Sequence, residues 1–158
     1  MLFSATKSAM AVGTGALTTT GPAGATLIEI DPPANRVALL KQWWVAFKGV
    51  SATDPPVNVQ LCILSVTSAA GTALTPVSMR IGQPVAVTTA KTLPATEGTS
   101  AALEEQYIPP TTGYMEQYPL GEEPQLLGAA ATAIGYALRG DRGSGAAVNA
   151  AAGLQFEE

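Results

Sequence analysis

The stretch Arg36–Val50, RVALLKQWWVAFKGV, decides the fold that this sequence predicts. Most of its odd positions are apolar, with Lys41 as the exception, whereas its even positions include Gln42 and Lys48. This period of two is typical of a β-strand that buries one face. The apolar odd positions, which we expect in the core, are Val37, Leu39, Trp43, Val45 and Phe47.

Alternation of the same kind recurs on both sides of this stretch, between turns rich in glycine and proline. The chain contains 16 glycines and 12 prolines and no convincing amphipathic helix. Ala-rich Gly128–Ala137 has helical propensity, but its larger apolar residues alternate, which favours a strand. The sequence therefore predicts an all-β fold, an antiparallel β-sandwich of the jelly-roll type. The other expected strands are Phe3–Val12, Thr26–Asp31, Val57–Thr67, Val77–Ile81, Val85–Thr92, Leu103–Ile108, Gly113–Tyr118, Leu126–Arg139 and Ala146–Phe156.

With 158 residues the chain has the length of one domain. We expect residues 25–158 to form the sandwich and residues 1–24 to form an extended N-terminal arm. The arm has almost no charge and includes Phe3, Val12 and Leu17, but it is too short to bury a core of its own. We expect it to become ordered along the sheet edge of a neighbouring subunit. The alternative is a first strand within its own sandwich.

Charged residues make up 13% of the chain, about half the usual share, and the net charge is −4. A surface with few ions can be covered by other subunits at little desolvation cost. The acidic balance argues against a nucleic-acid partner, and no apolar run is long enough to span a membrane or to act as a secretory leader. The absence of histidine removes the commonest general base and metal ligand. We therefore expect no enzyme activity, no cofactor and no metal site.

Two aromatic residues and one thiol stand out as candidate surface groups. Trp43 and Trp44 point to opposite faces of one strand, so we expect Trp43 in the core and Trp44 on the outer face, where it could anchor an interface. A packed second layer over Trp44 is the alternative. Cys62 has the outward parity and could lie near Trp44 as a free, non-catalytic thiol.

The acidic pairs and one tripeptide have simpler interpretations than catalysis or adhesion. Neighbouring strand residues point apart, so the pairs are expected to be solvated acids or intersubunit ion-pair partners, not glycosidase carboxyls. The tripeptide Arg139-Gly140-Asp141 is expected to be ordinary turn chemistry in a hairpin, not a host-adhesion motif. The pairs are Glu104 and Glu105, Glu122 and Glu123, and Glu157 and Glu158.

Several stretches after Val37 carry a family resemblance: WWVAFKGV, PPVNVQLCIL, YIPPTTGYMEQYPLGEEP, YALRG and LQFEE. With them, about three-quarters of the chain resembles a family of small tailed-phage virion proteins that decorate or cement capsids, and residues 1–34 lie outside the match. The segment IPP…QYPLG-x-EP and the terminal FEE are the most specific parts. In the family the residue after PLG is often basic, whereas this chain has Glu122 there.

The resemblance implies a jelly-roll protein, usually a homotrimer, on the exterior of the virion capsid, where it clamps subunits of the major capsid protein. Our expected contact elements are Trp44, the turn with Glu122 and Glu123, and the arm with Phe3, Val12 and Leu17. The alternative is a tail- or fibre-associated jelly roll that binds host-surface carbohydrate. In that case Tyr107, Tyr114 and Tyr118 would supply an aromatic platform.

Overall fold

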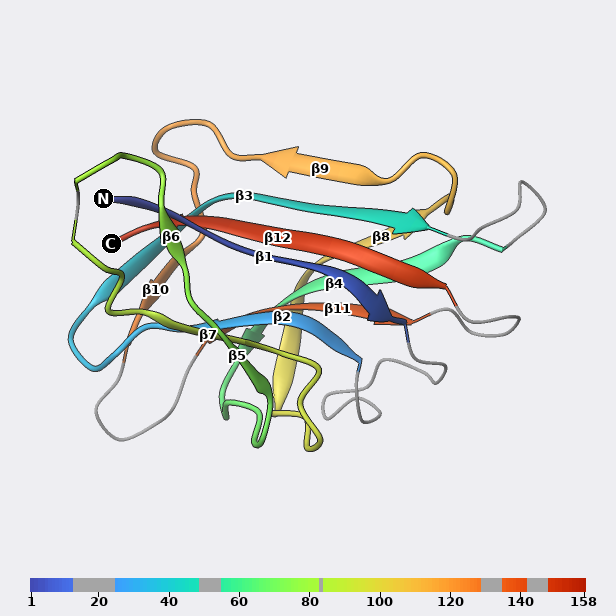
Figure 1. Ribbon diagram of the computed structural model, residues 1–158, viewed down its shortest axis with the longest axis horizontal. Coiled ribbons are helices and arrows are strands. Elements are labelled where there is room, and N and C mark those ends of the chain that lie inside the picture. The colour runs from blue at the N-terminus through green and yellow to red at the C-terminus, as the bar shows by residue number, and fades with distance from the viewer. Residues whose placement is uncertain (13–24, 49–54, 83, 129–134, 142–147) are drawn as a thin grey trace.

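The alternating stretches of the sequence form strands in the computed structural model, which describes residues 1–12, 25–48, 55–82, 84–128, 135–141 and 148–158. All regular structure in these ranges is β-strand, arranged in two antiparallel sheets that pack as a sandwich (Figure 1). The all-β sandwich prediction is therefore confirmed.

Sheet A carries the first and last strands of the chain side by side. Its strand order is β10-β3-β12-β1-β6, and β9 also pairs with β3 on the side where β10 lies. Long β3 and β12 form its centre. The strands are β1 (Leu2–Ala11), β3 (Val37–Lys48), β6 (Val77–Ser78), β9 (Tyr114–Gln117), β10 (Gln125–Leu127) and β12 (Asn149–Glu157).

Sheet B has the strand order β5-β7-β2-β11-β4-β8. The chain changes sheet at each step from β1 to β4 and again at each step from β8 to β9, β11 and β12 by way of the short β10, while β4 and β8 are neighbours in sheet B. As a result β1-β12-β3-β9 faces β2-β11-β4-β8, an order that is compatible with the expected jelly roll. Thr26–Asp31 forms a strand with the predicted bounds, whereas β5 was not predicted. The strands are β2 (Thr26–Asp31), β4 (Val57–Leu64), β5 (Thr72–Leu74), β7 (Thr89–Thr92), β8 (Ser100–Ile108) and β11 (Gly135–Asp141).

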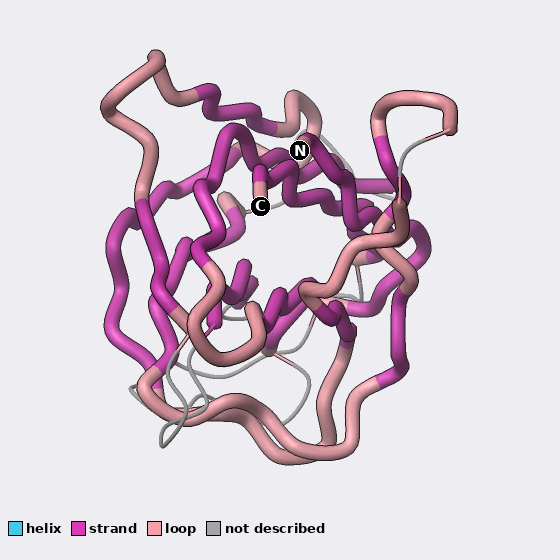
Figure 2. The backbone as a smooth tube through the Cα atoms, turned by 90° about the vertical axis from the view of Figure 1, so that its left-hand side faces the viewer, coloured by secondary structure: helices cyan, strands magenta, loops and turns pink. Residues whose placement is uncertain are grey.

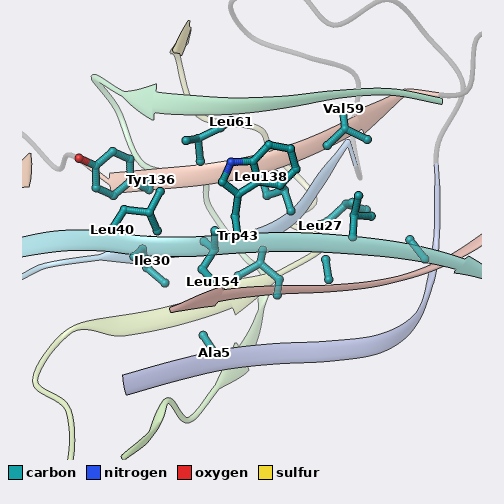
Figure 3. Close-up of a cluster of buried hydrophobic side chains, with 14 of the residues drawn as sticks. Ala5, Leu27, Ile30, Leu40, Trp43, Val59, Leu61, Tyr136, Leu138 and Leu154 are labelled. Carbon is teal, nitrogen blue, oxygen red and sulfur yellow. The ribbon is translucent and has the colours of Figure 1, made fainter. Parts of the chain in front are cut away.

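Trp43 lies at the centre of the core between the sheets, as its position in the sequence pattern predicts. Its side chain is fully buried. Figure 3 shows the indole rising from β3 toward Leu61 and Leu138, which come from sheet B. Burying an indole between two sheets removes a large apolar area from water and ties the sheets together.

A β-bulge at Lys41 reverses the facing of β3. Gln42 pairs with Gln155 but Leu40 pairs with Phe156, so Lys41 is an extra residue on the β3 side. Before the bulge the even positions, including Leu40, are buried; after it the odd positions are buried. The expectation that Val37 and Leu39 face the core is therefore wrong, because one inserted residue shifts the parity by one.

The first strand belongs to its own sandwich. β1 pairs with β12 along its length, and Phe3 stacks on Phe156 with ring centroids 5.8 Å apart. Phe3 and Val12 are buried in the core of their own chain, so the expected exchange with a neighbour is wrong for residues 2–12. The physical reason is that Phe3 and Ala5 alternate in phase with the core. Leu17 and the rest of 13–24 lie outside the described residues.

The outer face of sheet B is covered by two segments of the same chain, 65–71 and 93–99. They pair with each other through Ala69 and Thr96, and Ser68 donates its N–H to Glu29 of β2. Cys62 is fully buried beneath this cover beside Leu64, and burial raises the pKa of its thiol. The expected proximity of Cys62 to Trp44 is wrong, because the two residues lie on different sheets.

Arg139 fastens the same cover to β11. Its buried guanidinium donates to the Gly98 carbonyl oxygen (Nη2 to O, 2.6 Å) and lies 3.4 Å from the Glu97 carboxylate. Arg139-Gly140-Asp141 is therefore the end of a strand, with its arginine inaccessible to a receptor, and the expected hairpin placement of the tripeptide is wrong for these three residues. The hairpin's continuation at 142–147 lies outside the described residues.

Two carboxyl groups share one ammonium group at the other end of this cover. Lys91 Nζ lies 3.1 Å from Glu29 Oε1 and 3.0 Å from Asp31 Oδ2. The remaining oxygens, Glu29 Oε2 and Asp31 Oδ1, are buried and accept no hydrogen bond from the described residues. Burial, and then the neighbouring Glu29 charge, raise the pKa of Asp31 to about 7.

We predict that Asp31 contributes a decrease in the free energy of unfolding as the pH rises from about 4 to about 8. The folded state holds the Asp31 proton more tightly than the unfolded state, so its contribution is complete below the ordinary aspartate pKa and is lost as the pH passes 7. Urea unfolding across this range measures the slope. Asp31→Asn should flatten it, and an unchanged slope in that variant would contradict the assignment to Asp31.

Candidate functional site

A cleft of about 760 Å³ lies on the outer face of sheet A, at the end of the molecule where the two chain ends meet. Its floor comes from β3, β9 and β12. One wall is the loop after β6, and the other is the turn after β9, both at the end of the molecule marked N and C in Figure 1. We call it the sheet A cleft; its principal lining residues are Lys41, Gln42, Met79, Arg80, Gln117, Pro119, Leu120, Glu123, Gln155 and Glu157.

The first wall, which includes residues 79–82 and 84–88, is held at one end by β1 and at the other by Glu158. Met79 donates its N–H to the Leu2 carbonyl oxygen at 3.0 Å, which continues the pairing of β6 with β1. The Glu158 carboxylate accepts the N–H groups of Val87 (2.7 Å) and Thr88 (2.9 Å). Backbone donors that would otherwise need water are thus satisfied by one side chain.

The second wall is the tight turn Pro119–Glu122. Glu122 donates its N–H to the Pro119 carbonyl oxygen, and Gly121 has a φ of 90°, as the third position of a type II turn requires. Glycine adopts this φ without strain, which explains the sequence PLG in physical terms. Leu120, at the second position, projects into solvent and is 90% exposed.

A shared ion pair joins this turn to the last strand. Lys41 Nζ lies 2.8 Å from Glu123 Oε1 and 2.9 Å from Glu157 Oε2. Hydrogen bonds from Lys41 lower the pKa of both carboxyls, and the same bonds raise the pKa of Lys41. Glu123 belongs to the stretch PLG-x-EP and Glu157 to the stretch FEE, so these two stretches, singled out in the sequence analysis, meet at one lysine. We call the group of Lys41, Glu123 and Glu157 the Lys41 clasp.

Exposed aliphatic side chains lie on the two segments that flank the cleft: Met79 and Leu120 line it, and the others lie on β6 and the loop that follows it. Isolated apolar residues on a surface are ordinary, but a group of this kind marks a binding surface. Figure 2 shows two loops rising on opposite sides, with both chain ends between them. This set, which we call the apolar rim, supplies six of the thirteen large apolar side chains that are exposed in the described ranges: Val77, Met79, Ile81, Val85, Val87 and Leu120.

A row of three glutamines forms the middle of the floor. Gln42 pairs with Gln155 of β12 on one side and with Gln117 of β9 on the other. Side chains at paired positions of neighbouring strands are close enough to act on one ligand. An amide both donates and accepts hydrogen bonds, so the row offers neutral polar groups between apolar walls.

The predicted contact residues divide between this cleft and other places. Glu122 is exposed at the tip of the second wall, and Glu123 is part of the Lys41 clasp, so the structure places the acidic turn at the cleft. Trp44 lies on the outer face as predicted, but it is half-buried and lines a separate shallow hollow of about 390 Å³ with Met115. A Cβ at Gly153 would lie 2.4 Å from Trp44 Nε1, so the indole packs directly over that glycine.

The three tyrosines do not form one exposed platform. Tyr118 donates its hydroxyl to Glu104 at 2.5 Å, and Trp43 Nε1 donates to the same carboxylate at 3.2 Å. Tyr114 packs on the Trp43 ring with centroids 4.9 Å apart, whereas Tyr107 is exposed on β8. Burial and the bond to Glu104 raise the pKa of Tyr118. The expectation that Glu104 is solvated is wrong, because this carboxylate accepts hydrogen bonds from the buried Trp43 and the half-buried Tyr118.

No protein-family model matches this chain, and no curated protein or solved structure matches it. Within the described ranges, three acidic or thiol groups nowhere gather closely enough to hold a metal ion. The same ranges contain no helix with the length and apolarity needed to cross a bilayer. The cleft, the Lys41 clasp and the apolar rim are thus interpreted from their own geometry.

We predict that Lys41→Met loosens the tip of the second wall without unfolding the sandwich. Glu123 loses its cation, but the base of the turn keeps its backbone bonds, Tyr118 N–H to Lys41 O and Leu40 N–H to Pro124 O, each at 3.0 Å. Amide hydrogen exchange should therefore accelerate at residues 120–123. Lys48→Met, an exposed position on the same strand, is the control. Equal exchange in both variants would show that the clasp does not order the turn.

Proposed function

We propose that this protein is a non-enzymatic structural component of a tailed-phage virion, which binds the outside of the capsid and stabilises the lattice of the major capsid protein. The apolar rim is the observation that carries this proposal. Its two walls are fixed by Glu158 and by the Lys41 clasp, and the clasp is built from the sequence stretches that resemble capsid-decorating proteins.

The chemistry of the rim suits a protein partner. Ile81 is fully exposed, as is nearly all of Leu120, and such aliphatic groups gain most when a complementary surface removes them from water. The charged groups on the floor are already paired with one another through Lys41. A partner can therefore cover the cleft without stripping water from unpaired floor charges.

Cementing follows from repetition of such contacts. A homotrimer would present three rims to neighbouring capsid subunits, and closed symmetry lets the same patch serve at each contact. Once one rim is bound, the others bind at high effective concentration, so modest single contacts add up to durable attachment. No reactive group is needed for this task.

The acidic side chains that catalysis would require have structural partners. Glu104 accepts bonds from Trp43 and Tyr118, while Glu123 and Glu157 bind Lys41. The glutamine row favours the second candidate, a carbohydrate-binding tail or fibre module. The aliphatic walls favour the first, because sugar rings pack best on exposed aromatic faces.

The proposal is tested with empty shells of the phage that encodes this chain, prepared without it. The purified protein should sediment with the shells, and the double variant Ile81→Asp, Leu120→Asp should bind at least about tenfold more weakly, as loss of interface anchors does. Leu103→Asp places the same charge at an exposed leucine of sheet B and should bind like the natural sequence.

Absence of shell binding, together with selective binding on a glycan array, would replace the capsid role by the carbohydrate role. Undiminished shell binding by the double variant would show that the apolar rim is not the contact surface.

A further inference from the structure

The floor of the sheet A cleft carries a row of polar side chains that crosses three neighbouring strands. The walls of the cleft stand at opposite edges of sheet A, one beyond β1 and the other after β9. Gln155, Gln42 and Gln117 lie on three adjacent strands between these walls. Adjacent strands are about 4.8 Å apart, so the outer two glutamines are separated by about 10 Å.

That separation equals two strand spacings, which is the distance between the two neighbours of a strand inside a sheet. The backbone groups of an extended chain point alternately to its two sides. A chain lying above Gln42 would therefore direct its C=O and N–H groups toward Gln117 on one side and Gln155 on the other. Side-chain amides match peptide groups because both donate and accept.

The charges of the cleft restrict the side chains of such a chain. Lys41 pairs with Glu123 and Glu157, and the N-terminal ammonium group of Met1 lies 3.7 Å from Glu157 Oε1, so two cations balance the two carboxylates and each of these floor charges has a partner. Arg80 on the first wall is exposed and forms no ion pair with the described residues. The walls otherwise present Met79 and Leu120. An apolar segment with one carboxylate opposite Arg80 complements this arrangement.

We infer that the sheet A cleft receives one extended, mainly apolar segment of the capsid subunit, which lies along β3 between Gln117 and Gln155 and places an acidic side chain against Arg80. This inference rests on the proposed function and specifies the form of the partner. The aliphatic walls fit amino-acid side chains better than sugar rings. Tyr118, the aromatic residue in the lining of the cleft, is half-buried and its hydroxyl donates to Glu104, so it does not offer a free aromatic face with a free hydroxyl to a sugar.

Photo-crosslinking on intact shells tests the inference. A benzophenone amino acid is placed at Met79 in one variant and at Leu120 in another, so that the two walls are probed separately. After irradiation of each bound protein, mass spectrometry identifies the crosslinked residues. Both positions should crosslink to one continuous stretch of the capsid subunit, about ten residues or fewer in length, that contains one Asp or Glu.

Crosslinks to distant segments of a folded surface, or to a second copy of this chain, would overturn the inference while leaving shell binding intact. Binding of the shells without any crosslink from either wall would do the same. Failure of the protein to bind shells would instead overturn the proposed function, so the two failures are distinguishable.

A synthetic peptide of the identified stretch provides the second measurement. It should bind the isolated protein, and Gln117→Glu should weaken its affinity about tenfold, since the floor then loses a donor and gains a charge. Gln125→Glu makes the same change at an exposed position of sheet A outside the cleft and should have no effect. Arg80→Gln should weaken the binding of this peptide. It should not weaken the binding of a control peptide in which the acidic side chain is replaced by its amide. Equal losses of affinity for the two peptides would contradict the role of Arg80.

Discussion

The extra residue in β3 is the constraint on which both faces of sheet A depend. A strand of uniform parity would direct Lys41 and Trp43 to the same side, and an ammonium group would then enter the core. The bulge separates them, so the indole fills the space between the sheets while Lys41 reaches Glu123 and Glu157 outside. Core and cleft are thus fixed by one local irregularity, and neither could be built on a regular strand of this sequence.

The alternation in the sequence was sufficient to predict most strands, because an apolar pattern with a period of two matches the alternating faces of a β-strand and not the 3.6-residue period of a helix. Thr26–Asp31 is found with its predicted bounds, and Trp43 is buried as expected. The pattern could not reveal the bulge, since Lys41 was visible only as an exception to it. Phe3 was assigned to an exchanged arm because composition alone does not tell which sheet edge a strand will join; its pairing with β12 is a long-range event.

The candidate site was less accessible to sequence reasoning, because its parts are far apart in the chain. The acidic turn was recognised from its motif, but its partner Lys41 is about eighty residues away. The glutamine row consists of single residues on three strands, each unremarkable in its own context. Glu104 was assigned to solvent because a carboxylate beside a turn is usually solvated, and only the packing of Trp43 and Tyr118 gives it a structural role.

Acid and alkali act on opposite surfaces of this sandwich. The carboxyls that bind Lys41 on sheet A have lowered pKa values, so protonation weakens that surface as acidity rises. Asp31, beneath the cover of sheet B, has a raised pKa, so the packing of that cover is weakened as the pH rises and Asp31 loses its proton. A low pH therefore weakens the outer face of sheet A first, and a higher pH weakens the outer face of sheet B first. The pH of the buffer thus decides which face of the molecule undergoes local unfolding more readily.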